Sequence, residues 1–388
     1  MEILAWIYFS ISCAIWCGFY IYAAKMSRSL PAIKKELPLN QVELPTISVI
    51  VTARDEAETI EAGLQSLIEQ DYPNFEIIII NDRSTDRTGE IIDRCAGHHP
   101  QIKPIHIDHL PEHWLGKVNA LNHGVAIASG DWLLFTDADV HHHKTLWQRA
   151  ITHAINDQLD HLALMPNVPH PGNMFQACMK AFTLLFLSSA NVKQIKNPES
   201  KAAIGIGAFN LVRHSAFKQT PGFEWLRMEV GDDYGIGIML KQNGFRINFA
   251  TAFYDLQVEW YKNIPDMIRG LDKNIMAPGT RFSRFKLIVS PIIFSALLLA
   301  PFLSLISFNP PFFIFGISVL LCTSLISIYM GMNKQENVSA WLLSPIGFLI
   351  IGYTFTRACI LCLLRDGIIW RGTYYPRKLL RKYQRVKL

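Results

Sequence analysis

The sequence has few charged residues and an excess of apolar ones. Asp, Glu, Lys and Arg make up 18% of the 388 residues, whereas hydrophobic residues make up 50%. Charged residues account for about 25% of an ordinary soluble domain. This composition excludes a disordered chain, a collagen-like chain and a protein that is soluble along its whole length. We therefore expect a globular domain joined to membrane segments.

Two other common features are missing. The seven cysteines do not form a disulfide framework, because five of them lie inside apolar runs. This usage is consistent with a chain that faces a reducing compartment. No Gly-rich P-loop is present, which excludes a Walker-type nucleotide site. We expect no nucleic acid partner.

Long apolar runs indicate where the chain meets a membrane. Residues 3–24 carry no charge and are long enough to cross a hydrocarbon core of about 30 Å as a helix. Residues 287–333 are also uncharged, and Asn309, Pro310 and Pro311 predict a turn between two spans there. Residues 337–356 are a further candidate. Since no basic segment precedes the first run, we expect an anchor and not a cleaved signal peptide.

Basic residues predict the orientation of the domain. Lys25 and Arg28 follow the first apolar run, which places the large domain on the cytoplasmic side. The segment after residue 364 carries eight Lys and Arg residues against Asp366 alone, so it should also be cytoplasmic. Three full C-terminal spans would place it on the opposite side. We therefore expect one of those segments to be a re-entrant or interfacial helix.

The predicted organisation has four parts. It consists of an N-terminal transmembrane anchor, a cytoplasmic domain, C-terminal membrane segments and a basic cytoplasmic tail, at residues 1–27, 28–285, 286–364 and 365–388. The expected location is the inner, cytoplasmic membrane, as a multi-pass protein with the catalytic domain facing the cytoplasm.

Within the domain, strand and helix patterns alternate. Apolar β-rich runs predict strands, and amphipathic runs between them predict helices, the second capped by Ser84 or Thr85. The strands are predicted at 47–52, 75–80, 102–107 and 132–135, and the helices at 57–69, 86–95 and 117–128. This alternation predicts an α/β fold with a mostly parallel sheet, whose ligands bind at the carboxyl ends of the strands.

The residues that follow these strands are acidic. Asp55, Asp82, Asp137 and Asp139 each come directly after a predicted strand. Carboxylates that converge on one edge repel one another unless a cation lies among them, and Mg²⁺ and Mn²⁺ favour carboxylate oxygens. Asp137 and Asp139 point to the same side of an extended segment and can address one ion. The adjoining residues 141–143, three histidines, are expected in a solvated turn, with an extra metal ligand as the alternative.

Four motifs in order carry a resemblance to a known family. Residues 49–56 (VIVTARDE), 81–86 (NDRSTD), 116–124 (GKVNALNHG) and 137–139 (DAD) resemble the successive motifs of family 2 glycosyltransferases. The resemblance covers about residues 46–250. It implies the GT-A fold, a Rossmann-like nucleotide-sugar-binding domain, and a nucleotide-diphosphate sugar as the donor.

The resemblance also implies roles for the acidic residues. Asp55 and Asp82 match the positions that hold the base and ribose of the donor. Asp137 and Asp139 match the D-x-D motif, which binds Mg²⁺ or Mn²⁺ on the diphosphate. Lys117 matches a basic residue near the donor, where an ammonium group pairs with phosphate. The alternative for Lys117 is a solvated lysine at the start of a helix.

Transfer of a sugar to a hydroxyl also needs a base. Family 2 enzymes keep it in an acidic pair at the start of a later helix, and residues 229–233 (EVGDD) are similar to that element. We assign Asp233 as the base and Asp232 as its support, with the order of the two left open. An acidic helix start stabilised by the helix dipole is the alternative.

A missing motif narrows the family further. Processive polysaccharide synthases carry Q/R-x-x-R-W after the base, but the corresponding residues 260–274 do not. Arg269 and Lys273 in this stretch are predicted either to approach the diphosphate leaving group or to face an anionic lipid surface. Residues 110–117 and 369–375 are similar to membrane glycosyltransferases of carotenoid and hopanoid pathways, although Thr373 stands where Arg is usual.

The acceptor is predicted to be a lipid. Residues 174–187 are unusually apolar for the domain, and we expect either an interface helix that feeds a lipid acceptor or a core helix. The implied reaction is inverting transfer to a hydroxyl of a carotenoid, hopanoid or glycolipid. A polyprenyl-phosphate glycosyltransferase and a catalytically silent nucleotide-sugar-binding membrane protein are the alternatives.

Overall fold

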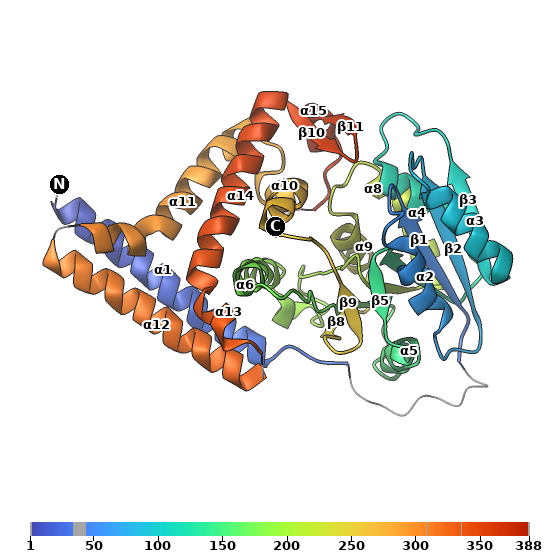
Figure 1. Ribbon diagram of the computed structural model, residues 1–388, viewed down its shortest axis with the longest axis horizontal. Coiled ribbons are helices and arrows are strands. Elements are labelled where there is room, and N and C mark those ends of the chain that lie inside the picture. Colours follow the sequence, from blue (N-terminus) through green and yellow to red (C-terminus); the bar gives the residue numbers. More distant parts are fainter. Residues whose placement is uncertain (1, 34–43, 308, 335, 387–388) are drawn as a thin grey trace.

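The computed structural model describes residues 2–33, 44–307, 309–334 and 336–386, and Figure 1 shows their arrangement. The long helices gather on one side of the molecule and the sheet on the other. The helices are α1 (Glu2–Arg28), α2 (Ile60–Ile68), α3 (Thr88–His98), α4 (Gly116–Ile127), α5 (Leu146–Asn156), α6 (Asn173–Ser189), α7 (His214–Lys218), α8 (Gly222–Leu226), α9 (Asp232–Gln242), α10 (Ile264–Thr280), α11 (Arg284–Ile306), α12 (Pro310–Lys334), α13 (Val338–Leu342), α14 (Ser344–Arg365) and α15 (Arg377–Tyr383).

The strands form one large sheet and two small ones. The large sheet has seven strands in the order β3-β2-β1-β4-β7-β6-β8, and only β7 runs antiparallel to its neighbours. The strands are β1 (Ile47–Ala53), β2 (Phe75–Asp82), β3 (Ile102–Ile107), β4 (Trp132–Asp137), β5 (Val140–His142), β6 (His161–Met165), β7 (Asn210–Arg213), β8 (Ile247–Thr251), β9 (Leu256–Val258), β10 (Gly367–Trp370) and β11 (Thr373–Pro376). The predicted α/β fold with a mostly parallel sheet is confirmed.

Burial explains why the central strands read as continuous apolar runs. Ile77, Ile78, Ile79 and Ile80 of β2 are all fully buried, because helices cover both faces of the sheet. The helix α4 packs on β1 and β2, and α3 packs on β2 and β3. These contacts hold the carboxyl ends of the strands in fixed positions.

The predicted cap of the second helix, at Ser84 or Thr85, was wrong. The helix α3 begins at Thr88, whose backbone N–H donates to Asp86 Oδ1 at 2.9 Å, so neither Ser84 nor Thr85 caps it. Both residues instead join the loop after β2 to Asp55: the Asp55 N–H donates to Ser84 Oγ, and the Thr85 N–H donates to Asp55 Oδ1. Asp86 therefore accepts the hydrogen bond at the start of α3, while Ser84 and Thr85 join the two loops.

The histidines at 141–143 do not form a solvated turn. His141 and His142 belong to β5, which pairs with β9 in a separate two-stranded sheet. His142 is buried, and its Nδ1 accepts a hydrogen bond from Trp147 Nε1 at 3.1 Å. Alternation along a short strand, not a turn, sends one of these imidazoles into the core.

Within the described residues, four helices are long and apolar enough to cross a membrane: α1, α11, α12 and α14. The helix α1 packs against α11 and α12, and α11 packs against α12 and α14. Since α14 also packs on α6 and α10, it lies between the other three helices and the domain. The candidate span predicted at 337–356 corresponds to α13 and most of α14, with Arg357 inside the helix.

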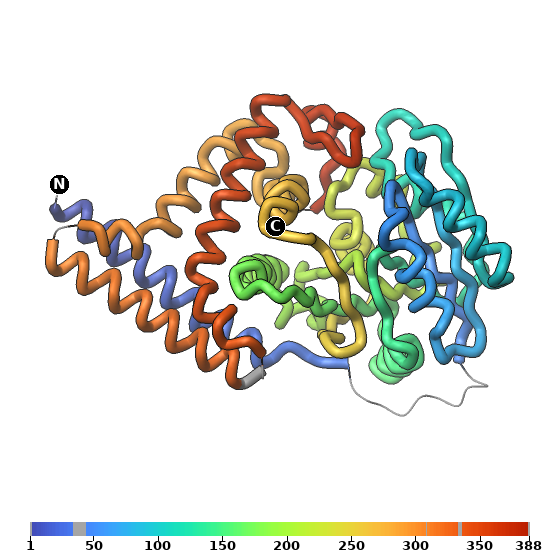
Figure 2. The backbone as a smooth tube through the Cα atoms, in the orientation of Figure 1, coloured from blue at the N-terminus to red at the C-terminus, as the bar shows by residue number. Residues whose placement is uncertain are grey.

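Both ends of α14 lie on the side of the bundle that faces the domain. At its start, Ser344 Oγ is hydrogen-bonded to Tyr20 OH near the end of α1, at 2.9 Å. Just past its end, Asp366 lies 3.4 Å from Arg284, the first residue of α11. Figure 2 shows the consequence: α1, α11 and α12 converge at the far end of the bundle, whereas α14 runs across the near side.

The segment after α14 returns to the domain. The backbone N–H groups of Arg385 and Val386 donate to Glu229 Oε2 at 2.6 and 2.9 Å. Glu229 is buried and lies three residues before α9. The C-terminal segment therefore packs against the part of the domain that carries the predicted acidic pair.

Candidate active site

The register of the sheet brings the acidic loops together. In the parallel pairs, Ala53 of β1 lies opposite Asn81 of β2, and Thr52 lies opposite Asp137 at the end of β4. The three strands therefore end at the same edge. Asp55, Asp82 and Asp137 occupy the rim where ligands of such sheets bind.

The first two loops form one connected surface. Asp82 is buried, and both its oxygens accept hydrogen bonds from the Arg83 guanidinium, at 2.7 and 2.9 Å. Asp55 Oδ1 accepts from the Thr85 N–H at 2.7 Å. Asp55 and Arg83 both have positive φ, 54° and 56°. Non-glycine residues adopt this conformation mainly where the surroundings enforce it, often at functional sites.

Lys117 joins the D-x-D motif to the acidic pair. Its Nζ lies 2.7 Å from Asp137 Oδ1 and 3.7 Å from Asp232 Oδ2. Burial opposes the charge of Lys117, but the surrounding carboxylates raise its pKa above the usual value. For Asp137, burial favours the neutral form, yet Lys117, Lys273 and Arg371 together lower the pKa. Lys117 is thus a half-buried member of the site, not a solvated lysine.

Asp139 lies in a strongly acidic environment. Burial, followed by repulsion from Asp137 and Glu56, raises its pKa to about 7. The described residues contain no cluster of three or more His, Cys, Asp or Glu side chains suited to a metal. Mg²⁺ is usually held by one or two carboxylates, with phosphate and water as the other ligands. Asp137 and Asp139 fit a divalent cation of that kind.

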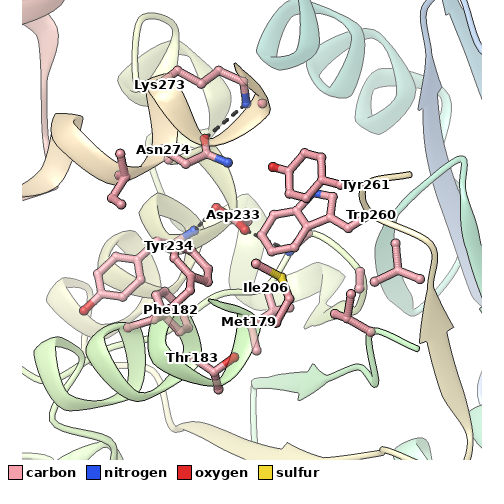
Figure 3. Close-up of a pocket in the computed structure, with 18 of the residues that line it drawn as sticks. Met179, Phe182, Thr183, Ile206, Asp233, Tyr234, Trp260, Tyr261, Lys273 and Asn274 are labelled. Carbon is pink, nitrogen blue, oxygen red and sulfur yellow. Dashed lines mark hydrogen bonds between the residues drawn. The ribbon is translucent and has the colours of Figure 1, made fainter. Parts of the chain in front are cut away.

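The predicted acidic pair opens α9. Asp232 is buried beside Lys117, and burial raises its pKa to about 6. Asp233 accepts hydrogen bonds from the backbone N–H groups of Gly207 and Tyr234, both at 2.8 Å. Burial also raises the pKa of Asp233, against the opposing effect of Lys117. Figure 3 shows the Asp233 carboxylate facing the pocket below Lys273 and next to Trp260.

One large cavity connects this rim to the apolar helices. It has a volume of about 1810 Å³, and it reaches from Asp137 and Asp233 to Phe294 and Leu297 of α11 and Phe355 of α14. The cavity therefore has an acidic end and an apolar end.

Aromatic rings line the cavity beside Asp233 (Figure 3). The Trp260 and Tyr261 rings stack with centroids 5.2 Å apart, and Phe182 of α6 meets Trp260 edge-on at 5.8 Å. Such rings offer flat apolar surfaces with a polar edge. They lie where an acceptor would have to approach Asp233.

The structure separates the two basic residues predicted near the leaving group. Lys273 is half-buried in the site, 4.1 Å from the centre of the Trp370 ring, and desolvation together with Lys117 lowers its pKa to about 8. Arg269 is exposed and pairs with Asp266 one turn earlier on α10. Lys273 thus joins the acidic rim, whereas Arg269 lies at the mouth of the cavity.

Several residues of the site were not found by sequence reasoning. The hairpin β10–β11 places Arg371 against Glu56 and the Arg54 carbonyl, and Tyr375 OH accepts from the Gly116 N–H at 3.3 Å. Residues 369–375 were noted for their similarity to membrane glycosyltransferases. Because they follow the last apolar helix, nothing in the sequence placed them at the acidic rim.

The fold and the acidic rim define a glycosyltransferase domain of the GT-A class. Residues 48–220 match the family model described as glycosyl transferase family 2. The match to family 2 of the glycosyltransferases therefore concerns the domain at residues 48–220.

Curated relatives point the same way. The chain is 32% identical over 138 residues to the probable glycosyltransferase YdaM of Bacillus subtilis. This alignment covers 35% of this chain and 32% of the relative. It is 27% identical over 260 residues to the poly-β-1,6-N-acetyl-D-glucosamine synthase of Staphylococcus aureus. That alignment covers 66% of this chain and 58% of the relative. The match thus spans 32% and 58% of the lengths of these two proteins.

A solved structure supports the fold. The mannosyltransferase PcManGT of Pyrobaculum calidifontis, in complex with GDP-Man and Mn²⁺, matches with a TM-score of 0.55 and 18% identity. The match covers 93% of this chain and 99% of that one. At this identity the likeness concerns the fold alone.

Proposed function

We propose that the protein is a membrane-bound, inverting glycosyltransferase that moves a sugar from a nucleotide-diphosphate donor to a hydroxyl group of a lipid. The observation that carries this proposal is the single cavity lined by Asp137 and Asp233 at one end and by Leu297 and Phe355 of the apolar helices at the other. A water-soluble donor suits the first end. An apolar acceptor suits the second.

The proposed donor half is the loop surface around Asp55 and Asp82, which holds the base and ribose. Lys117 and Lys273 provide positive charge on the diphosphate side, where an ammonium group pairs with phosphate oxygens. Asp137 and Asp139 would hold Mg²⁺ or Mn²⁺, which would neutralise the charge that develops on the leaving diphosphate. The PcManGT structure is a complex with GDP-Man and Mn²⁺, which is in keeping with this assignment.

Asp233 is the proposed base. The acceptor hydroxyl oxygen forms a bond to the anomeric carbon, the bond from that carbon to the diphosphate oxygen breaks, and the hydroxyl proton moves to Asp233. The nucleoside diphosphate leaves with the electron pair of the broken bond. The Gly207 and Tyr234 N–H groups fix the carboxylate, and its raised pKa makes it a better proton acceptor than an ordinary Asp. A single displacement of this kind inverts the anomeric centre.

We further propose that the domain faces the cytoplasm of the inner, cytoplasmic membrane and that only α1, α11 and α12 cross it. The basic residues after α1, and those after α14, then lie on the same side. The placement of both ends of α14 beside the domain supports its role as an interfacial helix. This arrangement removes the conflict between the number of apolar segments and the positions of the basic residues.

The proposal is tested with purified protein in detergent, Mg²⁺ or Mn²⁺, labelled nucleotide sugars and lipid extract. We expect labelled lipid from the wild type. The double variant Asp137→Ala with Asp139→Ala should form none, and Asp233→Asn should lose it by a factor of at least about 100, the usual contribution of a general base. Full activity of Asp233→Asn would favour a polyprenyl-phosphate acceptor, which is already anionic and needs little base. Donor binding without any transfer would indicate a silent binding protein.

A further inference from the structure

The hairpin β10–β11 crosses from the membrane helices to the donor rim. It begins directly after α14, and its strands pair from Gly367 with Pro376 to Trp370 with Thr373. On one side Trp370 covers Lys273 of α10. On the other side Tyr375 accepts a hydrogen bond from the Gly116 N–H at the start of α4. The hairpin thus packs against both halves of the site.

Arg371 occupies the tip of this hairpin in an unfavourable backbone conformation. Arg371 and Gly372 form a two-residue turn, with φ of 46° and 76°. Such turns favour Asn, Asp or Gly at the first position. Glycine adopts positive φ without a steric cost, and Asn and Asp side chains bond to their own backbone, whereas arginine has neither advantage. A strained conformation at a site calls for a functional reason.

The guanidinium of Arg371 reaches toward the rim. Its Nη1 donates to the Arg54 carbonyl at 3.1 Å, and its Nη2 pairs with Glu56 Oε1. Its side chain is nevertheless half exposed at the edge of the cavity, with 50% of its surface accessible. It is also close enough to Asp137 to help lower the pKa of that carboxyl.

Three other cations of the rim have partners inside the protein. Arg83 is bound to both oxygens of Asp82. Lys117 lies between Asp137 and Asp232, and Lys273 lies against the Trp370 ring. Arg371 is more exposed than two of them: 50% of its side-chain surface is accessible, against 17% for Arg83 and 24% for Lys117. An incoming anion can therefore reach the guanidinium while Glu56 stays paired with it.

We infer that Arg371 binds the diphosphate of the nucleotide donor and that the hairpin β10–β11 closes the donor site as a strap. This inference rests on the proposed function, since it requires a nucleoside diphosphate at the rim. A guanidinium offers paired N–H donors that match phosphate oxygens. Because the strap continues directly from α14, it also ties the donor site to a helix that lines the apolar end of the cavity.

The test compares nucleotide affinities of Arg371→Asn and the wild type. Asn tolerates positive φ, so this substitution removes the charge while it keeps or improves the turn. Isothermal titration of the full chain in detergent, in EDTA and again in Mn²⁺, measures the affinity for UDP and for uridine, and for GDP and for guanosine. Lys378→Gln, an exposed cation of α15 just beyond the hairpin, is the matched control.

We expect Arg371→Asn to bind the preferred diphosphate about tenfold more weakly, with unchanged affinity for the nucleoside. The diphosphate affinity of Arg371→Lys should lie between those of the wild type and Arg371→Asn. Lys378→Gln should bind the diphosphate as tightly as the wild type. Equal diphosphate affinity in Arg371→Asn would overturn the inference but leave the proposed function intact. An equal loss for nucleoside and diphosphate would reduce Arg371 to a structural role. A wild type that binds neither UDP nor GDP would overturn the proposed function and the inference with it.

Discussion

Asp233 combines a fixed position with an unusual affinity for protons. Two backbone N–H groups hold its carboxylate, and such bonds by themselves would lower the pKa. Burial outweighs them and raises the pKa above that of an ordinary Asp. The neighbouring ammonium of Lys117 acts in the opposite direction. The balance of these groups sets the pH range in which Asp233 could act as the proposed base.

The rate of transfer should therefore depend on pH. The base works only when ionised, so kcat falls as the pH drops through the pKa of Asp233, by about tenfold per pH unit below it. This fall should begin at a higher pH than the ordinary Asp pKa of 3.8 allows. In Lys117→Met the loss of a positive charge should raise that pKa further and move the fall to higher pH. A profile of kcat against pH for both proteins checks this, and a shift toward acid in the variant would contradict it.

At the scale of elements, the start of α9 depends on the loop that faces it. A Cβ atom added to Gly205 would lie 1.7 Å from the Asp233 carbonyl oxygen and 3.0 Å from Asn210 Nδ2. Real side chains do not approach a backbone oxygen so closely, so the loop or α9 would have to move. Glycine at 205 thus allows the close contact that positions the proposed base.

Gly205→Ala should lower both the transfer rate and the midpoint of thermal unfolding. A displacement of about 1 Å at a reacting group costs on the order of 100-fold in rate. Gly97→Ala is the control, since a Cβ at Gly97 of α3 meets nothing within 4 Å and alanine favours a helix. Parallel activity assays and thermal melts of the two variants compare these effects. Wild-type behaviour of Gly205→Ala would show that the loop does not position Asp233.

The elements that the sequence predicted best are those with strong local patterns. The buried strands β1, β2 and β4 and the carboxylates after them follow from apolar runs that end in Asp residues. The environment of His142 could not be predicted, because contacts with β9 and Trp147 decide it. Ser84 and Thr85 were wrongly assigned as caps of α3, because contacts with the Asp55 loop occupy both residues. Arg371 and Glu56 are 315 positions apart in the sequence, so no local pattern predicts their contact.

At the scale of the whole molecule, the proposed membrane topology depends on α14. Its start bonds to α1 and its end lies beside the first residue of α11. A helix with both ends on one side does not reverse the topology of the chain. The hairpin that follows can then reach the donor rim without passing through lipid.

Cysteine labelling tests this topology. Ser307→Cys places a thiol directly after α11, on the predicted outer side, and Lys378→Cys places one in α15, on the predicted cytoplasmic side. In intact cells or spheroplasts, a membrane-impermeant maleimide should label Ser307→Cys but reach Lys378→Cys only after permeabilisation. The unsubstituted protein measures the background from the seven native cysteines. Labelling of Lys378→Cys in intact cells would mean that α14 crosses the membrane.

The central claim is that one cavity holds a soluble donor and an apolar acceptor. The most direct measurement compares two identical substitutions on α11: Leu297→Trp, which fills the apolar end of the cavity, and Leu299→Trp, which adds the same ring to the exposed face. With labelled donor and lipid extract, we predict that Leu297→Trp loses most of its labelled lipid and keeps its affinity for nucleoside diphosphate, whereas Leu299→Trp retains both. Equal lipid labelling by the two variants, or a label found only in water-soluble product, would contradict the claim.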